Sequence, residues 1–216
     1  MSEEPDRPGE RRHPPLMVGL HVAGRPALVV GGGRVATRRA ARLAAAGAVV
    51  TVVAPEASAE LQELAVRWLA RAYEPADVEG MVVVVAATDD PVVDAAVVAD
   101  AEAVGALVNH AGDQTAGSLL VPGEVEAGGI RVAVTTGGQS PVVARWLAGE
   151  IERDLLPVAA RAAEVLGRLR RELVEAGRST SHPGWQAAFE AGLVDLIRAD
   201  DLEAADALVR RHLGLG

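Results

Sequence analysis

The hydrophobic positions in the first half of the chain form short runs separated by amphipathic stretches. The apolar runs lie at residues 27–30, 49–53, 66–70, 81–86 and 106–109. Continuous runs of this kind are typical of parallel strands that are covered on both faces. The stretches with helical character lie at 34–46, 55–66 and 91–104. Their alternation with the runs predicts an α/β fold with a parallel sheet.

The pattern changes after residue 117. Segments at 118–121, 123–126 and 130–135 have the character of strands joined by short turns, which predicts a small hairpin layer outside the parallel sheet. Helical stretches follow at 141–155, 158–176, 184–197 and 202–213. We therefore expect a disordered tail at 1–15, a sheet domain at 16–121, a small α+β region at 122–156 and a helical segment at 157–216. Within the sheet domain, residues 16–22 form either an edge strand or an extended lead-in.

The turn after the first strand reads Gly31-Gly32-Gly33-Arg34-Val35-Ala36. Gly31 permits a tight turn, Gly33 lets the backbone approach a pyrophosphate, and Ala36 keeps the following helix close to the sheet. The free N–H groups at the start of that helix then face an anion. Because the turn directly follows an apolar strand and opens a helix, it predicts a Rossmann-type dinucleotide site rather than a simple connection.

The second strand lacks the usual acidic residue at its end, about 20 residues beyond the glycines, that binds the ribose. Glu56 follows Pro55 in the next loop, which favours NAD over NADP, although Arg34, Arg38 and Arg39 offer contacts to a phosphate. Thr88 follows the central strand, at the sheet edge where ligands bind in such folds. The predicted cofactor contacts are Gly31, Gly33, Arg34, Val35, Pro55, Glu56 and Thr88.

Composition narrows the possible functions. The net charge of −9 argues against nucleic acid as a partner. The chain contains neither lysine nor cysteine, which excludes Schiff-base chemistry, thiolate nucleophiles and cysteine-bound metals. No cluster of His, Asp and Glu has metal-ligand spacing, so we expect no fixed metal site. No apolar stretch reaches the roughly 18 residues of a membrane span, and the charged, proline-rich start is no secretory signal. We expect a cytoplasmic protein.

Several separated motifs occur in a characteristic order, at residues 15–16, 29–39, 50–55, 86–90, 108–109 and 135–141. Together they resemble the precorrin-2 dehydrogenase and sirohydrochlorin ferrochelatase family, which forms the N-terminal part of bacterial sirohaem synthases and also occurs as stand-alone chains. The resemblance covers about residues 16–156. It implies NAD-dependent oxidation of precorrin-2 to sirohydrochlorin, with insertion of ferrous iron by the same site in some relatives. It also implies a homodimer whose interface is formed by 122–156, and a separate methyltransferase that supplies precorrin-2.

The resemblance places the catalytic base shortly after the fifth strand. Asp113 is our candidate, although it lies one position beyond the aspartate of some relatives. His110 is the competing candidate, because histidine titrates near neutral pH. Asn109, the single asparagine of the chain, either orients the substrate or holds the turn.

A second glycine motif, residues 135–141, precedes the helix at 141–155. Ser140 is suited to cap that helix, and Pro141 to occupy its first turn. The resemblance implies that Thr136 and Gly137 lie near the active site, together with Ser140. Arg145 and Arg34 are candidates for the carboxylates of a tetrapyrrole.

Two other functions remain open at this point. A nucleotide-sensing Rossmann module without catalysis would need only the first glycine turn, and the second motif counts against it. A chelatase without dehydrogenase activity would keep the fold and use no dinucleotide.

Overall fold

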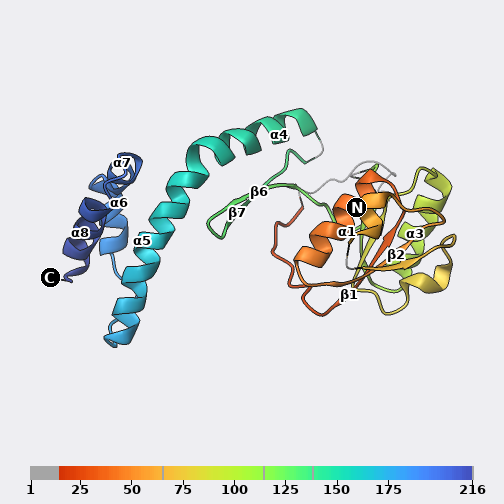
Figure 1. Ribbon diagram of the computed structural model, residues 1–216, viewed down its shortest axis with the longest axis horizontal. Coiled ribbons are helices and arrows are strands. Elements are labelled where there is room, and N and C mark those ends of the chain that lie inside the picture. Colours follow the sequence, from red (N-terminus) through yellow and green to blue (C-terminus); the bar gives the residue numbers. More distant parts are fainter. Residues whose placement is uncertain (1–14, 65, 114, 138, 216) are drawn as a thin grey trace, which may run out of the picture. The chain divides into compact units, whose positions relative to one another are not determined.

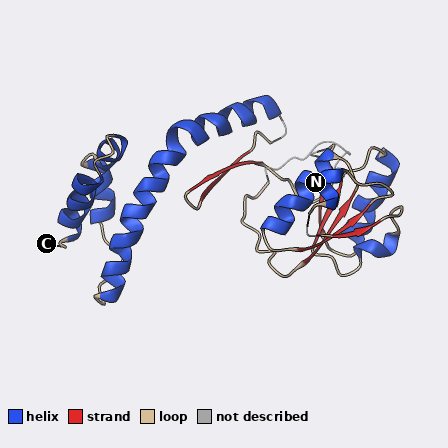
Figure 2. Cartoon of the chain, viewed as in Figure 1, coloured by secondary structure: helices blue, strands red, loops and turns tan. Residues whose placement is uncertain are grey.

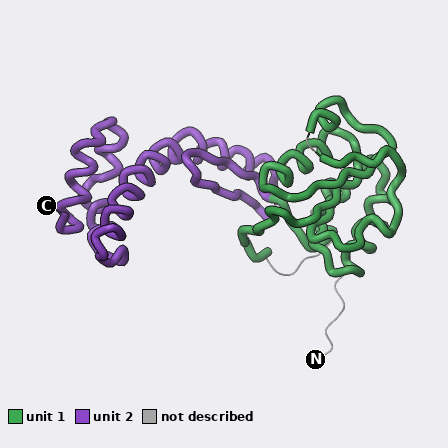
Figure 3. Tube along the Cα trace, turned by 60° about the horizontal axis from the view of Figure 1, so that its bottom comes forward, with its two compact units in different colours: residues 1–121 green, residues 122–216 purple. Residues whose placement is uncertain are grey.

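The structure is a computed structural model. It describes residues 15–64, 66–113, 115–137 and 139–215. The expected tail at 1–15 lies, except for Pro15, outside these residues. The chain forms two compact units, Met1–Val121 and Pro122–Gly216 (Figure 3).

The first unit is a five-stranded parallel sheet with helices on both faces (Figures 1 and 2). Its strands are β1 (Pro26–Val30), β2 (Val49–Val53), β3 (Arg67–Leu69), β4 (Val83–Ala86) and β5 (Leu107–His110). The helical elements are α1 (Arg34–Ala45), α2 (Ala59–Gln62), the 3-10 turn η1 (Pro75–Val78) and α3 (Pro91–Ala103). The spatial order β3-β2-β1-β4-β5 is that of the Rossmann fold without its sixth strand. This confirms the predicted α/β fold and puts the change of direction, where ligands bind, between β1 and β4.

The alternation of side chains along β1 explains the two layers. Leu28 and Val30 pack on the face that carries α3, against Val97 among others. Val29 packs on the opposite face, against Ala36 of α1. Because both faces are buried, the strand contains no polar residue, as the sequence pattern indicated.

Two predictions for the first unit were wrong in detail, and the alternatives for residues 16–22 are decided in favour of the extended lead-in. The helix expected at 55–66 is only the four-residue α2, because residues 54–58 are a loop that contacts the glycine turn: the Ser58 N–H donates to the Gly32 carbonyl at 2.9 Å. Residues 16–22 are an extended lead-in without strand pairing. Residues 118–121 form no strand, although the Leu119 N–H donates to the Val108 carbonyl at 2.8 Å.

The second unit begins with an antiparallel hairpin and continues as helices (Figure 1). The hairpin pairs β6 (Gly123–Ala127) with β7 (Ile130–Val134), as predicted. The helical elements are α4 (Pro141–Glu150), the π-helical turn η2 (Ile151–Leu155), α5 (Leu156–Glu175), α6 (Gly184–Glu190), α7 (Leu193–Arg198) and α8 (Leu202–Leu213). No helix of the described chain is long and apolar enough to cross a bilayer.

The interruption expected at residues 156–157, between the two predicted helices, is absent. Pro157 has no N–H to continue an α-helix, and its ring would collide with the carbonyl four residues earlier. The wider η2 turn accommodates it, with the Leu156 N–H donating to the Ile151 carbonyl, so α4, η2 and α5 are continuous. The single helix expected at 184–197 is instead broken at Gly192, whose φ is 100°.

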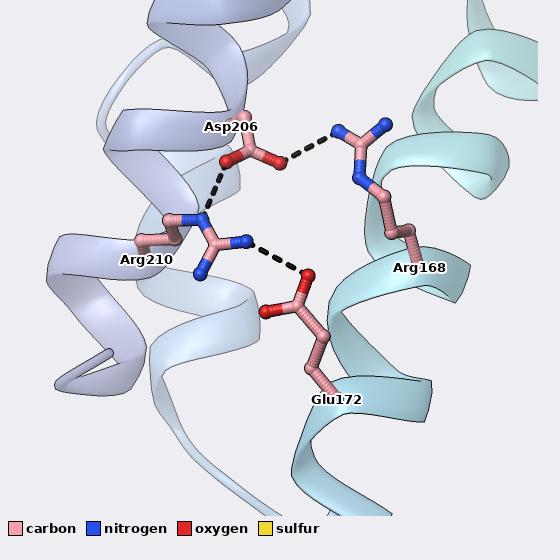
Figure 4. Close-up of polar contacts among 4 residues, drawn as sticks. All are labelled: Arg168, Glu172, Asp206 and Arg210. Atoms are coloured by element: carbon pink, nitrogen blue, oxygen red, sulfur yellow. Dashed lines mark hydrogen bonds and ion pairs between the residues drawn. The ribbon is translucent and has the colours of Figure 1, made fainter. Parts of the chain in front are cut away.

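The helices α5, α7 and α8 enclose the apolar core of the C-terminal segment, with Leu169, Ile197 and Val209 fully buried. A network of four charged side chains joins α5 to α8 at its edge (Figure 4). Asp206 accepts hydrogen bonds of 2.6 Å from both Arg168 and Arg210, and Arg210 also donates to Glu172 at 2.8 Å. Burial raises the pKa of Asp206, but the hydrogen bonds from the two arginines outweigh it and lower the pKa below its usual range.

Candidate active site

The carboxyl ends of β1, β2 and β4 surround a pocket of about 1110 Å³ in the first unit. Its floor is the glycine turn, residues 31–33, which follows β1. Its walls are residues 53–58 after β2 and 87–90 after β4. The pocket therefore lies at the change of direction of the sheet, where dinucleotides bind in this fold.

The glycine turn fits a pyrophosphate. Gly31 has a φ of 125°, and a methyl group there would lie 2.2 Å from the Ala87 carbonyl oxygen, so only glycine is compatible with this turn. Gly33 has no atom within 4 Å of an added methyl group, so its backbone is open to a ligand. Gly33 is also the N-cap of α1, and no side chain of the described residues caps that helix. The open backbone and the uncapped N–H groups together suit an anionic ligand.

The loop after β2 is fastened to the same turn. The Thr37 hydroxyl donates to the Gly33 carbonyl at 3.0 Å and lies 3.0 Å from the Ser58 hydroxyl. This arrangement brings Pro55 and Glu56 to the pocket wall. Of the three arginines that sequence reasoning offered for a phosphate, Arg34 lines the pocket, whereas Arg38 and Arg39 are not among its lining residues. Burial, together with the nearby Arg38 and Arg42, lowers the pKa of Arg39 to about 10.

Hydrogen bonds between the turn after β4 and helix α3 fix this wall of the pocket. Thr88 donates twice to one carboxylate oxygen of Asp94, from its N–H at 3.0 Å and from its hydroxyl at 2.8 Å. Asp90 caps α3 by accepting the Val92 N–H at 2.8 Å. These bonds fix the turn 87–90 between strand and helix.

The turn after β5 holds the two candidate bases. His110 Nδ1 accepts the N–H groups of Gly112 and Asp113, at 3.1 and 2.9 Å. The ring therefore carries its proton on Nε2, and His110 shapes the turn. The Asp113 carboxylate is exposed and accepts the Thr115 hydroxyl at 2.6 Å and the Thr115 N–H at 2.8 Å. Those bonds, the hydroxyl first, lower the pKa of Asp113, so it is an ionised proton acceptor at neutral pH.

Asn109 is almost completely buried, with 4% of its surface exposed. Its Nδ2 donates to the Leu119 carbonyl at 2.9 Å and so fastens residues 118–119 to β5. Its Oδ1 has no hydrogen-bond partner among the described residues. The Asn109 amide thus stabilises the local structure through Nδ2, while Oδ1 accepts no hydrogen bond from the described residues.

The second glycine motif, residues 135–141, lies in the second unit. Ser140 caps α4 by accepting the Val143 N–H at 3.3 Å, and Pro141 begins the helix, as predicted. Thr136 accepts the Ser140 N–H at 3.0 Å, and Gly137 has a φ of 63°. Arg145 Nε donates to the Pro141 carbonyl at 3.4 Å. These contacts form a compact cap around the start of α4.

The structure gathers all seven predicted cofactor contacts in the one pocket. They are Gly31, Gly33, Arg34, Val35, Pro55, Glu56 and Thr88. Ala111 and Gly112 also line it, but the predicted bases His110 and Asp113 do not, and neither does Asn109.

Sequence reasoning missed two side chains of this region. Tyr73 lines the pocket after β3, and its hydroxyl donates to Asp100 at 2.8 Å. Asp94 lies beneath the pocket wall, and its signal was available: a carboxylate at position 94 shares the buried face of α3 with Val97 and Ala101. In the described part of the chain, no group of three or more His, Asp or Glu side chains is arranged to hold a metal ion.

Comparisons with known proteins agree with a nucleotide-binding role for this pocket. Residues 18–123 match a family profile described as "Putative NAD(P)-binding". The chain is 40% identical over 196 residues to "Siroheme synthase 1" of Cronobacter sakazakii, covering 88% of this chain and 41% of that protein. It is 39% identical over 196 residues to "Siroheme synthase" of Chromobacterium violaceum, covering 88% and 42%. The chain thus spans about two fifths of the length of these relatives.

A solved structure, "SirC, precorrin-2 dehydrogenase", superposes with a TM-score of 0.71 at 26% identity, covering 92% of this chain and 97% of that one. This chain belongs to the precorrin-2 dehydrogenase family. Membership extends over both units, since the superposition covers nearly the whole chain. The pocket at the glycine turn is accordingly an NAD(P) site of this family.

Proposed function

We propose that this chain oxidises precorrin-2 to sirohydrochlorin, with NAD as hydride acceptor, in sirohaem biosynthesis. The observation that carries the proposal is the NAD(P) pocket beside the β5 turn, in a chain that matches SirC over 92% of its length. A nucleotide-sensing module would need the pocket alone. Proteins of sirohaem biosynthesis are enzymes, so the relatives favour catalysis over sensing.

The reaction removes a hydride and a proton from precorrin-2. NAD, held at the glycine turn, would supply the hydride acceptor for this reaction. The protein must orient the two reactants and accept the proton. We assign the proton to Asp113, because its hydrogen bonds with Thr115 keep the carboxylate ionised and its side chain is exposed. His110, with Nδ1 engaged by two N–H groups, orients the turn on which Asp113 lies.

NAD is preferred to NADP in this proposal. Glu56 lines the pocket in the loop after β2, where an acidic side chain can accept hydrogen bonds from a ribose. The same carboxylate repels a 2′-phosphate. Arg34, the arginine that lines the pocket, lies at the start of α1 beside the glycine turn, which suits the pyrophosphate.

Substrate contacts are proposed for each unit by itself. Precorrin-2 carries several carboxylates, and Arg145 is a cation suited to one of them. Thr136, Gly137 and Ser140 form the turn at the start of α4, and Asn109 retains a free acceptor at Oδ1 among the described residues. We assign these residues to substrate binding.

A homodimer is also part of the proposal. Helix α4 exposes four large apolar side chains within two turns, namely Val142, Val143, Trp146 and Leu147. Trp146 is 62% exposed. A cluster of this kind is unfavourable in water and is typical of an interface. We propose that α4 of a second copy covers it, in the cytoplasm where NAD-dependent synthesis takes place.

An anaerobic absorbance assay tests the activity. Purified protein is mixed with enzymatically generated precorrin-2 and NAD, and the spectra of NADH and sirohydrochlorin are followed. The proposal predicts that both appear together and only with NAD present. Binding of NADH without any oxidation of precorrin-2 would instead support the sensor.

Ferrous iron is then added to the same reaction. Faster sirohaem formation with the protein than without it would extend the activity to iron insertion, with iron as a substrate. Metal insertion without NAD binding would replace the proposal by the chelatase.

A further inference from the structure

Asp94 is one of two polar residues that are nearly fully buried in the described chain, with 4% of its surface exposed. It lies on α3, on the face that also carries the buried Val97 and Ala101. Burying a carboxylate is unfavourable unless hydrogen bonds compensate for the lost water. Its compensation comes from Thr88, at the pocket wall.

The Thr88 hydroxyl has a choice of acceptors. It lies 2.8 Å from Asp94 Oδ1 and 3.0 Å from the Asp90 carbonyl oxygen, and its own oxygen accepts the Asp90 N–H at 3.1 Å. A hydroxyl has one proton, and a carboxylate is a stronger acceptor than a peptide carbonyl. The proton therefore points to Asp94. Since the Thr88 N–H also donates to Asp94, both donors of Thr88 are used inside the protein.

The position of Thr88 matters for the glycine turn. The neighbouring Ala87 donates its N–H to the Val30 carbonyl at 2.9 Å. The carbonyl oxygen of Ala87 would lie only 2.2 Å from a methyl group placed on Gly31. The wall 87–88 and the turn 31–33 are therefore in backbone contact. A shift of Thr88 displaces the surface on which the pyrophosphate would lie.

We infer that Asp94 is a positioning residue of the cofactor pocket: it holds Thr88 from the core side and thereby fixes the wall against Gly31. Asp94 does not touch the ligand itself, because it is not among the residues that line the pocket. The inference rests on the proposed function in taking NAD(H) as the ligand. A carboxylate on α3 thus supports the pocket wall through its two hydrogen bonds with Thr88.

Titration of the full chain with NADH, followed by nicotinamide fluorescence, tests this role without any need for precorrin-2. Asp94→Ala removes the acceptor of both Thr88 donors and should weaken NADH binding about tenfold, equivalent to about 1.4 kcal/mol. Asp94→Asn keeps an oxygen acceptor at the same place and should bind within about threefold of the unmodified protein. In the oxidation assay, Asp94→Ala should raise KM for NAD and leave kcat nearly unchanged.

Val97→Ala is the matched control. It removes buried contacts from the same face of α3 and leaves Thr88 untouched, so it should lower the thermal midpoint at least as much as Asp94→Ala yet bind NADH normally. If folded Asp94→Ala binds NADH normally, or if Asp94→Asn is as impaired as Asp94→Ala, Asp94 is not a positioning residue. If the unmodified chain binds no NADH, the inference is also wrong. Normal NADH titrations without oxidation of precorrin-2 would overturn the proposed reaction alone.

Discussion

The Cα atom of Gly32 lies against the carbonyl group of Glu56, so that a methyl group on Gly32 would stand 1.8 Å from the Glu56 oxygen. Gly33, the next residue, has no atom within 4 Å of such a group and a φ of −84°. The middle glycine thus permits loop 54–58 to pack on the turn, whereas the third glycine leaves space for a ligand. Two neighbouring glycines are therefore required for different reasons.

We expect Gly32→Ala to lower mainly the stability of the fold and Gly33→Ala to weaken mainly the binding of NADH. Gly32→Ala must displace the loop after β2, and overpacking of this kind destabilises a protein by about 1–3 kcal/mol. Gly33→Ala should keep the thermal midpoint, because its backbone angles suit alanine, but should weaken NADH binding about tenfold or more by placing a methyl group in the pocket. Thermal unfolding and NADH titration of both variants measure this. Normal NADH binding by Gly33→Ala would contradict the assigned pyrophosphate position.

The sequence predicted the parallel sheet because apolar runs and glycine turns are local signals. It failed where a distant contact decides local structure. Residues 55–58 begin with a proline and precede a helical pattern. They nevertheless form a loop, because Ser58 and Glu56 contact the glycine turn about 25 residues earlier. The continuity of α4, η2 and α5 was missed for a different reason. Proline usually ends a helix, but one wider turn accommodates it here.

The same limit applies to the site. The grouping of the seven residues in one pocket could be predicted because they follow the ends of strands, which meet at one edge of a parallel sheet. Tyr73 was missed because β3 is only three residues long and its end is hard to locate. Asp94 was missed because it lies within a helix and not at the end of a strand, so its contact with Thr88 depends on how α3 packs on the sheet.

The low pKa of Asp113, the proposed base, should give the proposed oxidation a distinctive pH dependence. Hydrogen bonds from Thr115 lower that pKa below its usual range, so the carboxylate remains a proton acceptor as the pH falls from 8 to 5. A histidine base would instead lose activity over this range, because it becomes protonated. We therefore expect that protonation of Asp113 does not lower kcat between pH 8 and pH 5. A loss of activity on acidification that His110→Asn abolishes would identify His110 as the base.

Substitution of the base provides a second measurement. Asp113→Asn keeps the size of the side chain and removes the proton acceptor, and should lower kcat by about 100-fold or more. NADH affinity should stay unchanged, because Asp113 does not line the pocket. His110→Asn, which disturbs the turn and not the acceptor, should have the smaller effect. Equal NADH titrations for the two variants serve as the control for folding.

Glu56 should determine the choice between NAD and NADP. Glu56→Gln removes the charge that repels a 2′-phosphate, and the preference for NADH over NADPH should fall by about tenfold. Asp89→Asn is the charge-matched control, since Asp89 lines the opposite wall after β4. Titrations of the three proteins with both nucleotides decide the point. If Asp89→Asn changes the preference as much as Glu56→Gln does, net charge rather than Glu56 controls it.

The network on α5 and α8 should make the helical segment sensitive to acid. Asp206 has a lowered pKa, so its contribution to stability is fully present above the pKa of an unfolded aspartate, about 3.9, and is lost as the pH falls through the folded value. Asp206→Asn should lower the thermal midpoint at pH 7 by roughly 2–4 °C. The difference from the unmodified protein should vanish once the pH lies below the folded pKa of Asp206. A difference that persists there would show that the loss comes from packing and not from charge.

The exposed face of α4 gives the last prediction. Trp146→Glu places a charge among Val142, Val143 and Leu147 and should raise the dissociation constant of a dimer by about 30-fold or more, because aromatic residues dominate interfaces. Val174→Glu is the matched control: Val174 is 61% exposed on α5, against 62% for Trp146 on α4, so both changes add one charge at an exposed apolar position. Sedimentation equilibrium of the three proteins measures the effect. If both variants dissociate equally, or if the unmodified chain is monomeric at micromolar concentration, α4 does not form the interface. Dissociation by Trp146→Glu alone would place it there, and the oxidation assay on that monomer would then tell whether the second copy is needed for activity.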